Sequence, residues 1–166
     1  VGANQSFEQS VGLFVDGIHL AKGRQFRTGL FDVERVEVLR GPQGTLFGKN
    51  TLTGALNIIS AKPEIGGEFG GRIAVAAEDE NSGTEIEGHI NIPVADTFAI
   101  RLSFQDREND GYINNTYNNT TGPTADEQLL RFSASWQPSD QLRFDLKHTD
   151  GEHIRIGSTV MGSVFD

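Results

Sequence analysis

The sequence predicts two parts of different fold class, a small α+β domain over residues 1–63 and an antiparallel β-meander over residues 64–166. Glycines and a proline interrupt the first part too often for a long regular element. A stretch containing proline and paired glycines, residues 62–67, predicts a linker. After it the apolar residues recur with a period of two, which is typical of strands that have one apolar face.

The first part is expected to open with a hairpin. Two short apolar runs flank Asp16-Gly17, a pair that favours a primed two-residue turn. A second strand is predicted around Val36 and Val38, and it must stop at Gly41-Pro42 because proline cannot donate a ladder hydrogen bond. Residues 55–60 then resume as a short strand.

The segment from Phe31 to Pro63 carries a dense set of motifs. They are Arg40-Gly41-Pro42-Gln43-Gly44, Leu46-Phe47-Gly48, Asn50-Thr51 and Gly54-Ala55-Leu56-Asn57-Ile58-Ile59. The segment resembles the plug domain of TonB-dependent outer-membrane receptors. The resemblance implies a signature that forms the plug corner and permits its tight packing, consisting of Arg40, Gly41, Pro42, Gly44, Gly48, Asn50 and Gly54.

Five alternating runs follow the linker, and their apolar members define one stripe. They are Ile73, Val75 and Ala77; Ile86, Gly88, Ile90, Ile92 and Val94; Phe98, Ile100, Leu102 and Phe104; Leu130, Phe132, Ala134 and Trp136; and Leu142, Phe144 and Leu146. The stripe alone fits a soluble sandwich as well as a membrane wall. The resemblance favours a transmembrane β-barrel of which about five strands are present. Short connections alternate with long ones, the longest being a polar loop expected over residues 107–127, and Trp136 lies beside a short turn, as in outer-membrane barrels.

The resemblance also implies that the chain is a fragment. A portion of the plug is expected before Val1, and most barrel strands are expected after Asp166. Five strands leave two open edges and an exposed apolar face, so the isolated chain is predicted to aggregate or to require detergent.

Composition excludes several classes of function. The formal net charge of −9 disfavours nucleic acid as a partner, because binding a phosphate backbone requires clustered cations. The chain has no cysteine, so disulfides, thiolate metal sites and thiol nucleophiles are ruled out within it. No apolar run approaches the ~20 residues of a membrane-spanning helix.

No constellation predicts an enzyme or a cofactor. The segment from Gly44 to Asn50 resembles a phosphate-binding loop, but its spacing is one residue short and Asn50 occupies the hydroxyl position. Glu85 and Glu87 share one strand face, and a role on an inner wall is the better interpretation than acid–base chemistry.

His148 and His153, with Asp150 and Glu152 between them, match no defined metal-ligand spacing. They are interpreted as part of a polar loop or strand end, and no metal site is predicted.

The resemblance implies TonB-dependent import of a ligand, such as a siderophore–iron complex, across the bacterial outer membrane. TonB with its inner-membrane energising complex, outer-membrane lipid and a small extracellular ligand, which could be a metal chelate, are the implied partners. The alternative is a β-rich outer-membrane binding or adhesion module without energised transport. Candidate charge pairing between plug and barrel involves Arg35, Glu37, Arg40, Glu87, Arg101 and Arg131. A candidate ligand loop contains Tyr112, Asn114, Asn115, Tyr117 and Asn118.

Overall fold

The computed structural model describes residues 11–20, 30–42, 44, 51, 53–78, 83–111, 113–115 and 120–157. The chain divides into two compact units, Val1–Lys62 and Pro63–Asp166. Within the described ranges, no helix has the length and apolar character needed to cross a membrane.

The first unit contains a four-stranded mixed sheet with the order β2-β1-β4-β3. Its strands are β1 (Val11–Val15), β2 (Ile18–His19), β3 (Val33–Arg40) and β4 (Gly54–Ser60). Strand β1 runs parallel to β4, whereas the β1–β2 and β3–β4 pairs are antiparallel. The hairpin and both further strands predicted for this part are confirmed. The described residues leave the helical component of the α+β prediction untested.

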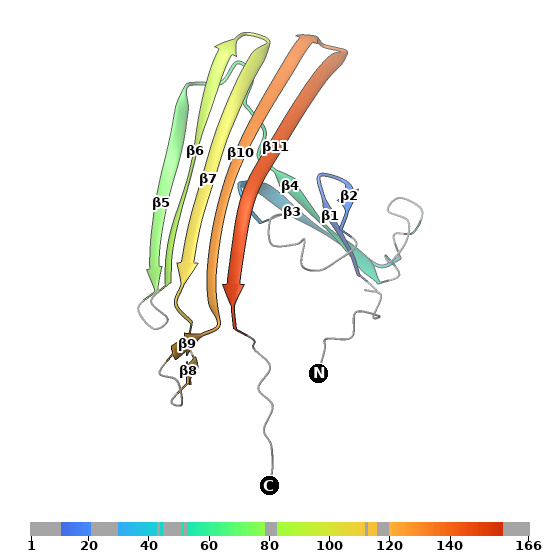
Figure 1. The fold of residues 1–166 in the computed structure, drawn as a ribbon. Helices are drawn as coiled ribbons and strands as arrows, with labels where there is room; N and C mark the ends of the chain where they lie inside the picture. The colour runs from blue at the N-terminus through green and yellow to red at the C-terminus, as the bar shows by residue number, and fades with distance from the viewer. Residues whose placement is uncertain are drawn as a thin grey trace. The chain divides into compact units, whose positions relative to one another are not determined.

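The second unit is an antiparallel sheet of five long strands in the order β11-β10-β7-β6-β5 (Figure 1). They are β5 (Gly70–Glu78), β6 (Gly83–Ala95), β7 (Phe98–Asn109), β10 (Thr124–Ser139) and β11 (Leu142–Ile156). A small hairpin of β8 (Ile113–Asn115) and β9 (Thr120–Gly122) connects β7 to β10. The predicted meander of five consecutive neighbouring strands is therefore confirmed.

Two predictions about connections are wrong. The long polar loop expected over residues 107–127 is partly strand, because β7 continues to Asn109, β10 begins at Thr124 and the β8–β9 hairpin lies between them. The stretch from His148 to His153 is not a loop or strand end but lies inside β11, paired with β10 throughout. Backbone hydrogen bonds to β10 hold this stretch extended whatever its side-chain polarity, so its hydrophobic pattern did not reveal it.

The five-stranded sheet has the reverse of the polarity found in water-soluble proteins. Ile73 and Leu130 on the apolar stripe are 71% and 58% exposed, whereas Arg131 and Ser135 on the opposite face are 2% and 0% exposed. Arginine is almost never fully buried in a soluble protein unless it is paired. The apolar face of this sheet therefore requires an apolar environment to be stable.

Candidate functional site

The β1–β2 hairpin is attached to β4 by a carboxylate at its turn. Asp16 and Gly17 both have positive φ, 50° and 79°, as a primed turn requires. The Asp16 carboxylate accepts hydrogen bonds from the Ser60 backbone N–H at 2.8 Å and from the Ser60 hydroxyl at 2.9 Å. The Asp16 N–H donates to the Ile58 carbonyl at 2.8 Å. One residue therefore forms the turn and closes the parallel β1–β4 pairing.

A second polar connection crosses the same sheet. Asn57 accepts a hydrogen bond from the Gly17 N–H at 3.4 Å, and its side-chain nitrogen donates to Glu37 Oε2 at 3.0 Å. Arg35 Nε donates to Glu37 Oε1 at 2.9 Å, and Arg35 also contacts Glu34. These contacts hold the hairpin, β4 and β3 in one register.

The hydrogen bond from Asn57, and next the one from Arg35, lower the pKa of Glu37 below its ordinary value. The hydrogen bond that Arg35 donates to Glu37 raises the pKa of Arg35, opposed by partial desolvation. Glu37 is thus held ionised over the whole physiological range. Sequence inspection missed this network. The one available signal was Asn57, a polar residue at 7% exposure inside the apolar run of β4.

The signature residues fall where β3 ends and β4 begins. Arg40 is the last residue of β3 and pairs with Gly54, the first residue of β4. Gly41 has a φ of 82°, and its N–H donates to the Thr53 carbonyl at 3.1 Å. Pro42 and Gly44 are described and exposed. Gly48 and Asn50 lie outside the described residues, and the corner and packing roles of the signature remain predictions.

The candidate charge-pairing residues divide between the two units. Arg35 and Glu37 pair with each other on β3, and Arg40 ends that strand. Glu87, Arg101 and Arg131 lie on the polar face of the second unit, on β6, β7 and β10. Pairing between the two groups remains a prediction.

The candidate ligand loop is only partly described. Asn114 and Asn115 belong to β8, paired with Thr121 and Thr120. Tyr112, Tyr117 and Asn118 lie outside the described residues. A ligand role for these residues therefore remains a prediction.

Glu85 takes part in cross-strand contacts on the polar face. It accepts a hydrogen bond from Gln105 Nε2 at 2.7 Å, and its other oxygen lies 3.6 Å from Arg107 Nε. In the same row across the sheet, Glu127 Oε2 lies 4.0 Å from His153 Nδ1. Among the described residues, no three or more His, Cys, Asp or Glu side chains are placed to hold a metal ion. These contacts join neighbouring strands and do not form a catalytic pair.

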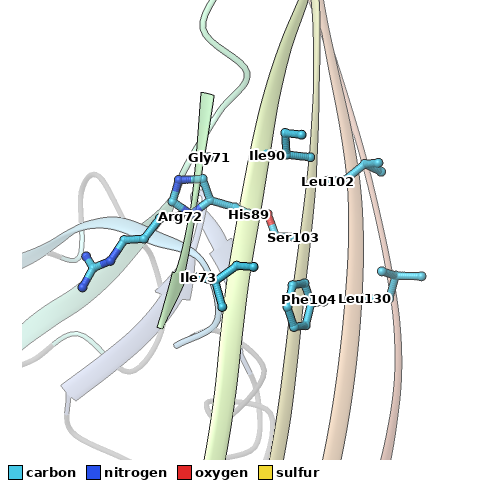
Figure 2. Close-up of a pocket in the computed structure, with 9 residues that line it drawn as sticks. All are labelled: Gly71, Arg72, Ile73, His89, Ile90, Leu102, Ser103, Phe104 and Leu130. Carbon is cyan, nitrogen blue, oxygen red and sulfur yellow. The ribbon is translucent and has the colours of Figure 1, made fainter. Parts of the chain in front are cut away.

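The apolar face contains a hollow of about 480 Å³ over β5, β6 and β7 (Figure 2). Gly71 and Gly88 contribute no side chain there, and the Phe104 ring lies over Gly88. In Figure 2, Arg72 and His89 extend to one side of the strands, and Leu102 and Leu130 to the other. The hollow therefore belongs to the apolar surface.

The apolar stripe ends at different heights on successive strands. Toward the long connections, the last large apolar side chain is Val75 on β5, which Ala77 follows, and its partner Ile86 on β6. On β11 the apolar run breaks after Leu146, in the row of Ile92, and apolar side chains return only at Ile154 and Ile156. Counted from Val75 to Leu146, the border shifts by six residues along the strands between β5 and β11. Three aromatic side chains mark the other end of the stripe, where Trp136 stacks on Phe144 at 5.5 Å between ring centroids and pairs with Phe98.

A family model of the TonB-dependent Receptor Plug Domain matches residues 2–55. The pesticin receptor of Yersinia pestis is 40% identical over 62 residues, which are 37% of this chain and 9% of the relative. The catecholate siderophore receptor Fiu of Escherichia coli K12 is 30% identical over 96 residues, 58% of this chain and 12% of the relative. The chain thus spans about a tenth of the length of the curated relatives it matches.

Solved structures share the fold over most of the chain. The ferric yersiniabactin uptake receptor FyuA from Yersinia pestis superposes with a TM-score of 0.72 at 24% identity, covering 91% of this chain and 24% of that one. The ferric-catecholate import receptor Fiu from Escherichia coli K12 superposes with a TM-score of 0.71 at 20% identity, covering 89% of this chain and 21% of that one. The plug match and the shared fold relate the chain to TonB-dependent receptors of the bacterial outer membrane.

Proposed function

We propose that the receptor containing this chain imports a ferric siderophore across the outer membrane with energy delivered through TonB. The supporting observation is the inverted polarity of the five-stranded sheet next to a plug sequence. Its exposed apolar face suits hydrocarbon, and its buried polar face suits the interior of a barrel occupied by a plug. The relatives reported above are named as a pesticin receptor and a catecholate siderophore receptor, which agrees with transport.

The oblique border of the apolar stripe supports the membrane assignment. Six residues correspond to about 20 Å along a strand. The five strands from β5 to β11 are separated by four inter-strand spacings, which correspond to about 19 Å across the sheet. A level membrane surface crossing the sheet along this border meets the strands at about 45°, which is the tilt of strands in transmembrane barrels. A soluble sandwich has no requirement for such a border.

Spin labels on adjacent residues of β11 test the orientation of the sheet. Leu146 and Lys147 point to opposite faces and are both exposed. The chain has no cysteine, so L146C and K147C in the full receptor, with any other cysteines replaced, each label one face. In lipid bilayers, oxygen should relax the label at position 146 more strongly than a water-soluble nickel complex does, and the order should reverse at position 147. The same order at both positions would refute the membrane-facing assignment.

Uptake in the presence and absence of TonB tests the transport proposal. The full receptor is expressed in a strain that lacks its own siderophore receptors, and ferric enterobactin and ferric yersiniabactin carrying radioactive iron are the probes. TonB-dependent accumulation of either probe is the expected result. Surface binding without accumulation would support the adhesion or binding alternative. Correct surface display with neither binding nor accumulation would refute siderophore import.

A further inference from the structure

The cations of the sheet's polar face are concentrated in two adjacent rows. The first row contains Arg72, His89, Ser103, Arg131 and Thr149, and the second contains Asn91, Arg101, Ser133 and Lys147. We name Arg72, Arg101, Arg131 and Lys147 the basic belt. The chain has 23 acidic and 14 basic residues, yet these two rows contain four permanent cations and no carboxylate. The local charge is therefore opposite to that of the chain.

Carboxylates border the basic belt on both sides. Glu87 lies in the next row toward the long connections, and Asp145 in the next row toward the short turns. Asp145 accepts hydrogen bonds from Arg143 Nε at 2.9 Å and from the Ser135 hydroxyl at 2.6 Å, and both of these donors lie outside the belt. The belt is thus a defined zone of positive charge within a mixed surface.

Small and large side chains alternate within the belt. Ser133 is the direct partner of both Arg101 and Lys147, and Ser103 is the direct partner of Arg131. Serines at these positions leave room between the long cationic side chains and add hydroxyl groups that can donate hydrogen bonds. A set of guanidinium, ammonium and hydroxyl donors on one rigid sheet is suited to oxyanions, and the planar guanidinium to carboxylates in particular.

Burial indicates when such a site acts. Arg101 and Arg131 are 7% and 2% exposed, and Arg131 Nε already donates to Thr149 Oγ1 at 3.1 Å. In this structure these two guanidinium groups are closed to an external ligand, whereas Arg72 and Lys147 are exposed. The buried half of the belt is consequently suited to a step during passage and not to the first contact with ligand.

We propose that the basic belt binds a negatively charged ferric chelate as it moves along the inner face of the sheet. This proposal rests on the proposed function and specifies its cargo as anionic. The interaction is electrostatic, since several positive charges fixed on a partly dehydrated wall attract an anion more strongly than the same charges in water. Removing one cation should therefore slow passage while leaving the first binding step intact.

Lys147 provides the main test because it is exposed, so its replacement changes the charge of the belt without opening a cavity. K147R, K147Q and K147E in the full receptor form a series of decreasing charge. Ferric enterobactin, which is anionic, is the probe, with surface binding measured in de-energised cells and uptake in energised cells. Dissociation constants should stay within about twofold, while uptake should be near normal for K147R, slower for K147Q and at least about tenfold slower for K147E.

R131Q and R131K extend the test to the buried part of the belt, and R143Q is the matched control. Arg143 lies on the same face but outside the belt and pairs with Asp145, so its replacement should leave uptake unchanged. Uptake rates that do not follow the charge at position 147 would overturn the proposal. So would a parallel loss of binding and uptake at normal surface display. A wild-type receptor without TonB-dependent uptake would instead refute the proposed function itself.

Discussion

Asp16 is predicted to control how firmly the hairpin of the first unit is held. Its carboxylate accepts hydrogen bonds from the backbone N–H and the hydroxyl of Ser60, a residue only 3% exposed. D16A removes the acceptor of the buried Ser60 N–H, which costs about 2 kcal/mol, and the contact with the Ser60 hydroxyl, which costs about 1 kcal/mol. It also places alanine at a φ of 50°, which costs about 1 kcal/mol. We therefore expect the free energy of opening the hairpin to fall by about 4 kcal/mol.

Two further variants separate these contributions. D16G removes the carboxylate but tolerates the positive φ, so it should cost about 3 kcal/mol. D16N retains one acceptor oxygen and tolerates positive φ, so it should cost less than about 1 kcal/mol.

Hydrogen exchange of β4 in the full receptor, followed by mass spectrometry, measures these differences. The Ala61 N–H, which donates to the Asp32 carbonyl at 2.9 Å, reports on the end of β4. D16A should accelerate exchange across residues 54–61 by about 1,000-fold and D16G by about 100-fold. Exchange in D16A within about twofold of the wild-type rate would refute the reasoning, as would equal rates in D16A and D16N.

Three further predictions concern packing and pH. In G88A the new Cβ would lie 2.6 Å from Phe104 Cε1, so unfolding of the receptor should become easier by about 1–3 kcal/mol, and F104L should reverse the effect. The hydrogen bond from Asn57 lowers the pKa of Glu37. The stabilisation that ionised Glu37 provides is therefore fully present above its ordinary pKa of 4.5 and is lost as the pH falls through its lower pKa in the folded state. Relative to the intrinsic exchange rate at each pH, the protection of β3 amides should therefore fall on acidification in the wild type but not in E37Q. W136A removes the stacked aromatic pair and should lower the free energy of unfolding by at least about 0.5–1.5 kcal/mol, whereas W136F should retain most of it.

Most of the strand order could be predicted because one face of each strand is apolar. The alternation around Leu102 and Phe132 is visible without any knowledge of partners. The second half of β11 could not be predicted, since its apolar alternation breaks after Leu146 and returns only at Ile154 and Ile156, and the strand is held by its pairing with β10. A pattern of side chains cannot reveal a strand whose stability comes from its backbone.

The polar network of the first unit was likewise beyond sequence inspection. Asp16 and Ser60 are 44 residues apart, and only the parallel β1–β4 pairing brings them together. The signature glycines were recognisable as motifs, but their spacing does not predict which carboxylate accepts a hydrogen bond from which backbone N–H.

By itself, the sequence determined the hairpin turn and the five-stranded meander, because turn residues and hydrophobic period act locally along the chain. The tertiary structure decided which polar groups meet across strands, how the cations gather in two rows and that the apolar border is oblique. These features depend on register, and register is set by hydrogen bonding between strands that are distant in the sequence.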